Sequence, residues 1–374
     1  MQTIRHEATE HIRPESVTLA GFEYIWAIRG SGTNPSSPRS VEYGMIPDVR
    51  KLQLLPLLEV TDQASFIAFV TRLRSCFGTT LVDVPQYLLD YSNRFRDGLE
   101  GLLKIYGDAV SFLTSFRKWI DVPVASSRWA IITPDYSAQT NMVRDLKKQF
   151  NRVAVRVFLP QLDIRQLSIS QKSYSNLLRN LPDKSIILLD VPEVTAYESV
   201  VAANISEMSR EAIGHGFSVY VLNAMDPEAG GHNYGPYFSH GDNLKGFGDL
   251  ATERRFSMGG GGYPTAVIKY YDFDGFVINE FRDRTGYQQA SQTMRDSQVW
   301  QKHNTHRSTC SVCLEVERAS SPQLSARYWK QFRIQHYLNS IDHETRALYT
   351  SVKSAQDLDP DGHHTIVQQS PPNP

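Results

Sequence analysis

The sequence predicts an α/β protein built on a (β/α)8 TIM-like barrel, with a β-hairpin and a helix appended on its C-terminal side. Eight short apolar runs rich in β-branched residues alternate with longer amphipathic stretches through the first 250 or so of the 374 residues. Such runs are typical of strands buried on both faces, and the alternation favours parallel pairing through right-handed crossovers. Eight strands are the number that closes this barrel. An open doubly wound sheet is the alternative, although no G-x-G-x-x-G follows the first run.

The expected strands and helices follow one another along the chain. The strands are expected at 24–29, 54–60, 80–84, 129–134, 153–159, 185–191, 217–223 and 246–251. The helices between them are expected at 64–77, 94–120, 137–150, 168–181 and 196–214, where apolar residues recur at helical spacing. Residues 31–40 are rich in Ser, Gly and Pro and predict a loop after the first strand.

The pattern changes after the eighth strand. Two alternating runs at 265–271 and 276–281 flank an Asp-Gly pair, which is a strong indication of a hairpin. A last helical region is expected at 323–349, and the Pro-rich polar tail beyond it is expected to be disordered. The expected organisation is therefore an N-terminal extension (1–20), the barrel (21–256), a hairpin and helical extension packed on the barrel (257–350) and the tail (351–374).

Charge and cysteine content exclude several classes of protein. Lys and Arg number 39 against 40 Asp and Glu, a net charge of -1, which excludes a uniformly basic, sequence-blind nucleic-acid binder. A basic, aromatic-rich segment around Trp329, Lys330 and Arg333 leaves a local nucleic-acid contact as a weaker alternative to packing on the barrel. Three cysteines fit a reducing cytoplasm, and no apolar run is long enough for a membrane span or a secretory signal. The oligomeric state stays open.

Polar residues end the expected strands, where barrel enzymes place their sites. These residues are Arg29, Glu59, Asp83, Asp135, Arg156, Asp190, Asn223 and Asp249. We expect Glu59, Asp83, Asp190 and Asp249 to be catalytic carboxylates that transfer protons or hold a divalent cation. We expect Arg29 and Arg156 to bind an anionic ligand, with Asp135 and Asn223 beside them. The alternative is that the arginines and carboxylates only satisfy one another.

The segment between the seventh and eighth strands is a second candidate. It carries His232 and His240 among glycines, and it is expected to lie over the barrel mouth. Either histidine could titrate near neutral pH and contact a ligand. A solvated loop without a function is the alternative.

Two pairs of potential zinc ligands occur close together, in the order His303, His306, Cys310 and Cys313. Only three residues separate the two pairs, whereas zinc sites of this kind usually separate them by about 12 or more. We therefore expect an exposed loop with two reduced thiols, or a local disulfide after oxidation, in preference to a metal centre. His336 is the residue that could replace one of the histidines as a ligand.

Several short motifs resemble those of the phage beta-protein family, whose members come from phages, prophages and bacterial genomic islands. The motifs are the strand Leu54–Glu59, the Phe-Gly-Asp at 247–249, the Cys-x-x-Cys at 310–313 and the Trp, Arg and His of the last helix at 329, 333 and 336. The family usually has a lysine where this chain has Arg29. The resemblance spans residues 22–345 and implies a barrel-like fold and a phage or antiviral-defence context, without implying a reaction.

Two functions are compatible with these features. The first is a phage- or defence-associated barrel protein that binds or acts on a small phosphorylated or nucleotide-like ligand at the strand ends. The second is a non-catalytic protein that binds a protein partner in phage–host conflict through the barrel loops and the hairpin. A divalent cation is a possible cofactor, any other cofactor stays unknown, and the sequence leaves open whether the protein is an enzyme.

Overall fold

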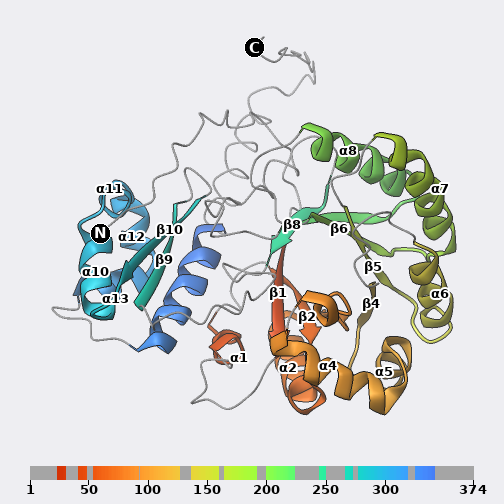
Figure 1. Cartoon of the computed structure of the whole chain (residues 1–374), viewed down its shortest axis with the longest axis horizontal. Helices are drawn as coiled ribbons and strands as arrows, with labels where there is room; N and C mark the ends of the chain where they lie inside the picture. Colours follow the sequence, from red (N-terminus) through yellow and green to blue (C-terminus); the bar gives the residue numbers. More distant parts are fainter. Residues whose placement is uncertain are drawn as a thin grey trace, which may run out of the picture.

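Eight parallel strands close into a barrel in the order β1 to β8, so the predicted closed barrel is confirmed. The computed structural model describes residues 23–30, 41–48, 54–91, 93–126, 136–159, 164–191, 199–223, 244–249, 266–272, 277–318 and 325–341. Figure 1 shows the barrel and its outer helices on the right and a smaller C-terminal extension on the left. The barrel strands are β1 (Glu23–Gly30), β2 (Leu54–Val60), β3 (Leu81–Asp83), β4 (Val122–Ser126), β5 (Ala154–Phe158), β6 (Ile186–Val191), β7 (Ser218–Asn223) and β8 (Gly246–Asp249).

Helices connect the strands in the expected places, with local breaks that the periodicity did not reveal. The helices are α1 (Val41–Met45), α2 (Gln63–Phe77), α3 (Leu88–Tyr91), α4 (Asn93–Tyr106), α5 (Ala109–Ser115), α6 (Ser137–Leu146), α7 (Ile164–Asn180) and α8 (Ser199–Gly214). The single helix expected at 94–120 is wrong. Gly107 has a positive φ of 86°, and the Asp108 side chain accepts from the Ser111 amide to start a new helix.

The fourth strand was predicted in the wrong place. It is Val122–Ser126, whereas the predicted residues 129–134 lie outside the described part of the chain. This strand is short and contains Pro123, a residue that argues against a central strand. Pro123 is aligned with β3, and the ladder with β5 begins only at Val124, so the proline lies where one of the two ladders has not yet started.

The barrel closes where β8 meets β1. Gly248 is aligned with Ile25, and a β-carbon built on Gly248 would lie 2.4 Å from the Ile25 carbonyl oxygen. That contact is with backbone, which cannot move aside as a side chain could. Closure of the barrel at this strand pair therefore requires glycine at position 248.

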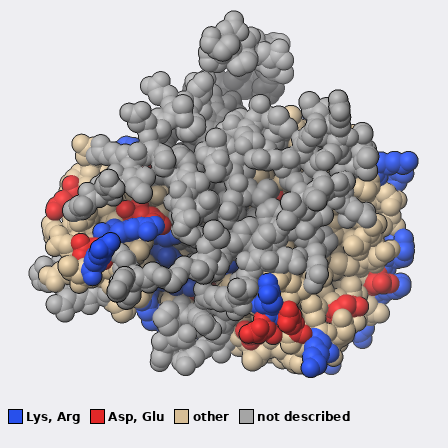
Figure 2. Space-filling model, in the orientation of Figure 1, with Lys and Arg blue, Asp and Glu red and all other residues tan. Residues whose placement is uncertain are grey.

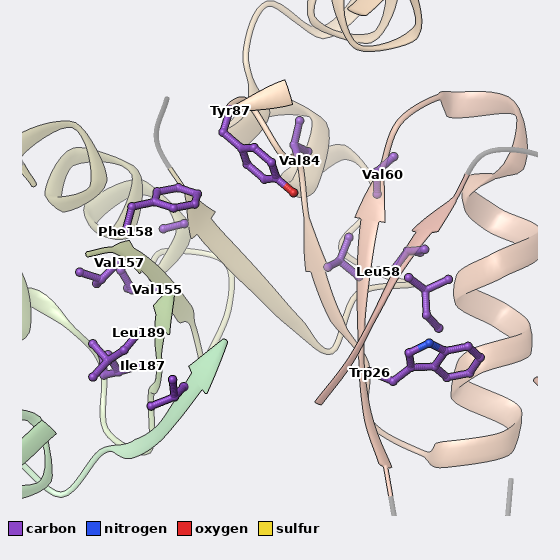
Figure 3. Close-up of a cluster of buried hydrophobic side chains, with 14 of the residues drawn as sticks. Trp26, Leu58, Val60, Val84, Tyr87, Val155, Val157, Phe158, Ile187 and Leu189 are labelled. Atoms are coloured by element: carbon purple, nitrogen blue, oxygen red, sulfur yellow. The ribbon is translucent and has the colours of Figure 1, made fainter. Parts of the chain in front are cut away.

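Alternate residues of each barrel strand face opposite sides. Outward residues such as Trp26, Leu58, Val155 and Leu189 pack in a large cluster that also holds apolar residues of the outer helices. Figure 3 shows these side chains around the strands. A second cluster fills the barrel interior and consists of Ile25, Ala27, Leu57, Leu81, Val122, Val124, Ala154, Ile186, Leu188, Tyr220 and Leu222, with Leu55 against it.

The extension contains the predicted hairpin and a helical core that was not predicted. Strands β9 (Ala266–Asp272) and β10 (Val277–Asp283) pair antiparallel, which confirms the hairpin. The helices are α10 (Tyr287–Arg295), α11 (Gln298–Lys302), α12 (Asn304–Thr309), α13 (Ser311–Arg318) and a last helix over residues 326–341. The exposed loop expected around Cys310 and Cys313 is wrong: both cysteines are buried in the apolar core of the extension.

The last helix lies between the hairpin and the barrel (Figure 1). Trp329 and Phe332 belong to the apolar core of the extension, whereas Tyr337 and Leu338 belong to the cluster around the barrel wall. This helix is thus shared by two cores and contacts the barrel wall. Both predicted terminal segments and the predicted boundary near residue 256 lie outside the described residues.

Candidate functional site

Six consecutive barrel strands each contribute one polar side chain to an ionic layer near their carboxyl ends. Its members are Arg29, Glu59, Asp83, Ser126, Arg156 and Asp190, one from each of β1 to β6. The residue two positions earlier on every one of these strands belongs to the apolar interior of the barrel. Because side chains alternate with a period of two, the six polar side chains share the inward direction of those apolar residues. The barrel interior is therefore apolar toward the amino ends and ionic toward the carboxyl ends.

Arg156 holds the centre of the ionic layer. Its Nη1 atom donates to Glu59 Oε1 at 2.7 Å and to Asp83 Oδ2 at 2.9 Å, and its Nε atom donates to Asp190 Oδ2 at 2.6 Å. All four side chains are almost completely buried. The rings of Tyr87 and Phe158 lie against the guanidinium, at 4.9 and 5.5 Å from its central carbon. One arginine is thus the common ion-pair partner of carboxylates from three different strands.

Arg29 extends the network toward the first strand. Its Nε atom donates to Glu59 Oε2 at 2.9 Å, and its Nη2 atom donates to the Tyr87 hydroxyl at 3.3 Å. Tyr87 in turn donates to Glu59 Oε1 at 2.6 Å, and its hydroxyl points into the barrel in Figure 3. The Arg29 side chain keeps 11% of its surface exposed, against 2% for Arg156 and none for Glu59. Arg29 is therefore the more accessible of the two arginines.

The pKa values of Glu59 and Asp83 are shifted in opposite directions. Burial opposes ionisation of Glu59, but Arg156, Arg29 and the Tyr87 hydroxyl outweigh it and lower the pKa of Glu59 to about 2. Burial dominates at Asp83 and raises its pKa to about 6, despite Arg156 and the hydrogen bond from Ser126. Burial also opposes the charge on Arg156, but Asp190, Tyr87 and Glu59 raise its pKa, so it remains a cation. The layer thus holds a fixed carboxylate at Glu59 and one that exchanges a proton near neutral pH at Asp83.

The predicted site residue Asp249 lies on the other side of the barrel wall. It is aligned with Trp26, which faces outward, and its carboxylate accepts hydrogen bonds from Tyr24 and from Tyr337 of the last helix. The prediction that Asp249 joins the other carboxylates is therefore wrong in its geometry. The physical reason is the alternation along β8, which turns Gly248 inward and Asp249 outward.

The other predicted ligand residues cannot be placed in the same way. Asp135, His232 and His240 lie outside the described residues, and Asn223 ends β7 with a side chain that is also outside them. Two members of the site were missed. Ser126 follows directly from the alternation once β4 is placed at 122–126, whereas Tyr87 comes from the segment after β3 and has no periodic pattern that would have indicated it.

The three central carboxylates were expected to be able to hold a divalent cation. Arg156 already lies within 2.9 Å of Glu59, Asp83 and Asp190, and it takes the position that a cation between these three groups would need. A metal ion there would have to displace a guanidinium that is buried with them. The donor set thus fits an internal arginine better than a divalent ion.

The basic, aromatic-rich segment belongs to the last helix and is largely engaged within the protein. Trp329 is buried, and Lys330 Nζ lies 2.6 Å from the carboxylate of Glu42 on α1. On the face in Figure 2, the described Lys and Arg side chains are interspersed with Asp and Glu. Trp329, Phe332 and Tyr328 pack in the apolar core of the extension, and Tyr337 packs against the barrel wall, so internal packing accounts for the aromatic residues.

Fold and site together define a class of protein: a (β/α)8-type barrel with a buried ionic layer at the carboxyl ends of its strands and a helical extension on its outer wall. No protein-family model matches the chain, and no curated protein does. The resemblance to the phage beta-protein family stays a prediction from its motifs. Within the described residues no helix is long and apolar enough to cross a membrane.

Proposed function

We propose that the carboxyl-end face of the barrel binds a small anionic ligand of the phosphorylated or nucleotide-like class, with Arg29 as its contact. The observation that carries this proposal is the ionic layer itself, since six strands in succession replace an apolar inward residue by a polar one at the same end. Ligand sites of this fold occur at that end. A guanidinium that is partly exposed there suits a phosphate or carboxylate.

Asp83 adds a dependence on pH to the proposed binding. Among the described members of the layer, two arginines face three carboxylates, so the layer carries one excess negative charge when Asp83 is ionised. Protonation of Asp83, whose pKa is about 6, removes that charge. We therefore expect an anion to bind more tightly as the pH falls through 6, and Asp83 is the described group best suited to acid–base catalysis.

The test is ligand binding to the full chain, measured by calorimetry and native mass spectrometry. The panel contains inorganic phosphate, sugar phosphates and nucleoside mono-, di- and triphosphates. Arg29→Gln should weaken binding about 10- to 100-fold, because a hydrogen bond to a charged group contributes about 1.5–3 kcal/mol. Arg74→Gln is the matched control, since Arg74 pairs with Asp121 on the outer surface. Equal affinity of Arg29→Gln and wild type would refute the role of Arg29.

The wider part of the proposal is a phage- or defence-associated protein of the cytoplasm. It is supported by the resemblance to the phage beta-protein family and by the low cysteine content. The alternative remains a non-catalytic protein that binds a protein partner. A stable partner in pull-downs that also binds Arg29→Gln and Asp83→Asn, together with a panel that shows no binding, would favour this alternative.

A further inference from the structure

Two cysteines and a histidine meet inside the extension, away from the ionic layer. Cys310 directly precedes α13, Cys313 lies in its first turn and His336 comes from the last helix. One donor atom from each of the three residues lies within 4.8 Å of the other two, and all three side chains are buried. Residues three apart on a helix share a face, so both sulfur atoms are presented to the same histidine.

The histidine is oriented with one ring nitrogen toward the thiols. His336 Nε2 lies 3.0 Å from the carbonyl oxygen of Tyr271. A carbonyl oxygen can only accept, so Nε2 donates a hydrogen bond to it and Nδ1 is the ring nitrogen that faces the thiols. Nδ1 lies 3.4 Å from Cys313 Sγ and 3.8 Å from Cys310 Sγ. The Tyr270 ring stacks on the imidazole at 4.2 Å and holds its plane.

These distances match a tetrahedral zinc shell. Zinc binds thiolate sulfur at about 2.3 Å and imidazole nitrogen at about 2.0–2.1 Å, so neighbouring N and S ligands of a tetrahedral ion are about 3.6 Å apart. The two observed separations of 3.4 and 3.8 Å lie on either side of that value. A backbone carbonyl that accepts from the second ring nitrogen is also what metal-bound histidines usually have.

The surroundings suit a pair of thiolates with a divalent ion. Two thiolates balance the two positive charges of zinc, so a loaded site buries no net charge in the apolar core. Asn339 Nδ2 lies 3.7 Å from Cys310 Sγ and donates to it.

We propose that Cys310, Cys313 and His336 bind one Zn²⁺ ion that joins α13 to the last helix. Three protein ligands leave one tetrahedral position for a water molecule or a further side chain. The ion would strengthen a small apolar core that also has to hold the hairpin, and small cores commonly depend on such a link. This inference is independent of the proposed ligand site in the barrel.

The test measures metal content of the full chain, purified under reducing conditions without a polyhistidine tag or chelator. We expect one zinc per chain by elemental analysis, and a native mass that exceeds the apo mass by one zinc less two protons. Cys313→Ala and His336→Ala should each reduce the zinc content to background. Cys76→Ala and His215→Ala are matched controls on α2 and just after α8, and both should keep one zinc per chain.

A second measurement keeps the proposal testable if the ligand variants do not fold. Wild-type protein is stripped by a chelator and titrated with Co²⁺, which should produce a thiolate-to-metal charge-transfer band with an end point at one ion per chain. The melting temperature should fall on stripping and recover with Zn²⁺. Absence of both zinc and the cobalt band, or a Cys310–Cys313 disulfide in the reduced preparation, would overturn the proposal.

Discussion

Arg156 is the residue on which the ionic layer depends. Its guanidinium is the partner shared by Glu59, Asp83 and Asp190, and all of these groups are buried. Removing one partner of a buried ion pair lowers the free energy of unfolding by much more than the intact pair contributes to it, because the other charge stays buried without compensation. Arg156→Met should therefore lower the free energy of unfolding by about 3–5 kcal/mol, measured by urea denaturation.

The control for this prediction is an arginine that forms its ion pair in water. Arg74 pairs with Asp121 at 3.0 Å, with 37% and 25% of the two side chains exposed. Such pairs contribute about 1 kcal/mol or less, so Arg74→Met should leave the free energy of unfolding nearly unchanged. Similar losses in the two variants would mean that Arg156 is not the electrostatic centre of the barrel.

Asp83 should make stability depend on pH in a direction unusual for a carboxylate. Its pKa is about 3.9 in an unfolded chain and about 6 in the folded protein, so between these values the folded protein binds more protons. Raising the pH from 4 to 6 therefore removes about 2 kcal/mol of stability, out of about 3 kcal/mol for the whole shift at 1.36 kcal/mol per pKa unit. Asp83→Asn cannot ionise. Relative to wild type it should gain about 2 kcal/mol over this interval and only a few tenths of a kcal/mol more above it.

Urea denaturation of both proteins at half-unit intervals from pH 4 to 8 measures this difference. Asp145→Asn is the control: Asp145 is exposed on α6, and its hydrogen bond with Lys148 lowers its pKa, so its contribution is lost only at lower pH. The free energy of unfolding of Asp145→Asn, plotted against pH, should run parallel to that of wild type between pH 4.5 and 8. A constant difference between Asp83→Asn and wild type would show that Asp83 does not titrate near 6.

At the scale of single residues, the sequence identified the polar members of the layer when they ended a well-placed strand. Glu59 and Asp190 follow long apolar runs, so their direction could be counted from the alternation, although Pro56 interrupts the run before Glu59. Asp249 shows why the alternation must be counted correctly, since an error of one position assigns a side chain to the outer face of the barrel instead of the inner face, or the reverse. Tyr87 depends on the path of the chain after β3, which no local pattern specifies.

At the scale of elements, Asp249 on the outer face of β8 links the barrel to the last helix. Tyr24 and Tyr337 both donate to its carboxylate, and burial followed by the charge of Asp249 raises the pKa of each tyrosine, so both remain donors. Tyr337→Phe removes one donor and leaves the other. The free energy of unfolding should fall by about 1.5–3 kcal/mol, as for other hydrogen bonds to charged groups.

Tyr106→Phe provides the comparison for Tyr337→Phe. The Tyr106 hydroxyl accepts from Gln63 in an exposed hydrogen bond between α4 and α2, so its removal should change the free energy of unfolding by about 0.5 kcal/mol or less. If Tyr337→Phe were equally mild, the Asp249 contact would not help to hold the extension on the barrel.

The elements themselves were predictable to the extent that they were long and regular. Seven of the eight barrel strands and the hairpin lie at the expected positions in the sequence, because their apolar runs are bounded by turn residues. β4 was missed because five residues with a proline, ending in Ala and Ser, do not resemble a buried strand. The short helices α10 to α13 were missed because they bury only narrow apolar stripes, against partners far away in the sequence.

At the scale of the whole molecule, two of the three apolar clusters of the described residues share the last helix, namely the cluster around the barrel wall and the core of the extension. Leu338 is fully buried in the core around the barrel wall, while Val316 is fully buried in the core of the extension. Because one helix belongs to both cores, the barrel and the extension should unfold together as one cooperative unit. Unfolding curves followed by far-UV circular dichroism and by tryptophan fluorescence should then coincide.

Leu338→Ala tests this cooperativity. Truncating a buried leucine costs about 2–5 kcal/mol, and in a single cooperative unit the whole loss appears in both unfolding curves, which shift together. Val316→Ala should also shift both curves together, although its side chain contacts the other core. Ile105→Ala is the control, because 67% of Ile105 is exposed on α4 and surface substitutions change stability by about 0.5 kcal/mol or less. Two separate transitions, with Val316→Ala moving only one, would mean that the extension folds as an independent domain whose helix merely rests on the barrel.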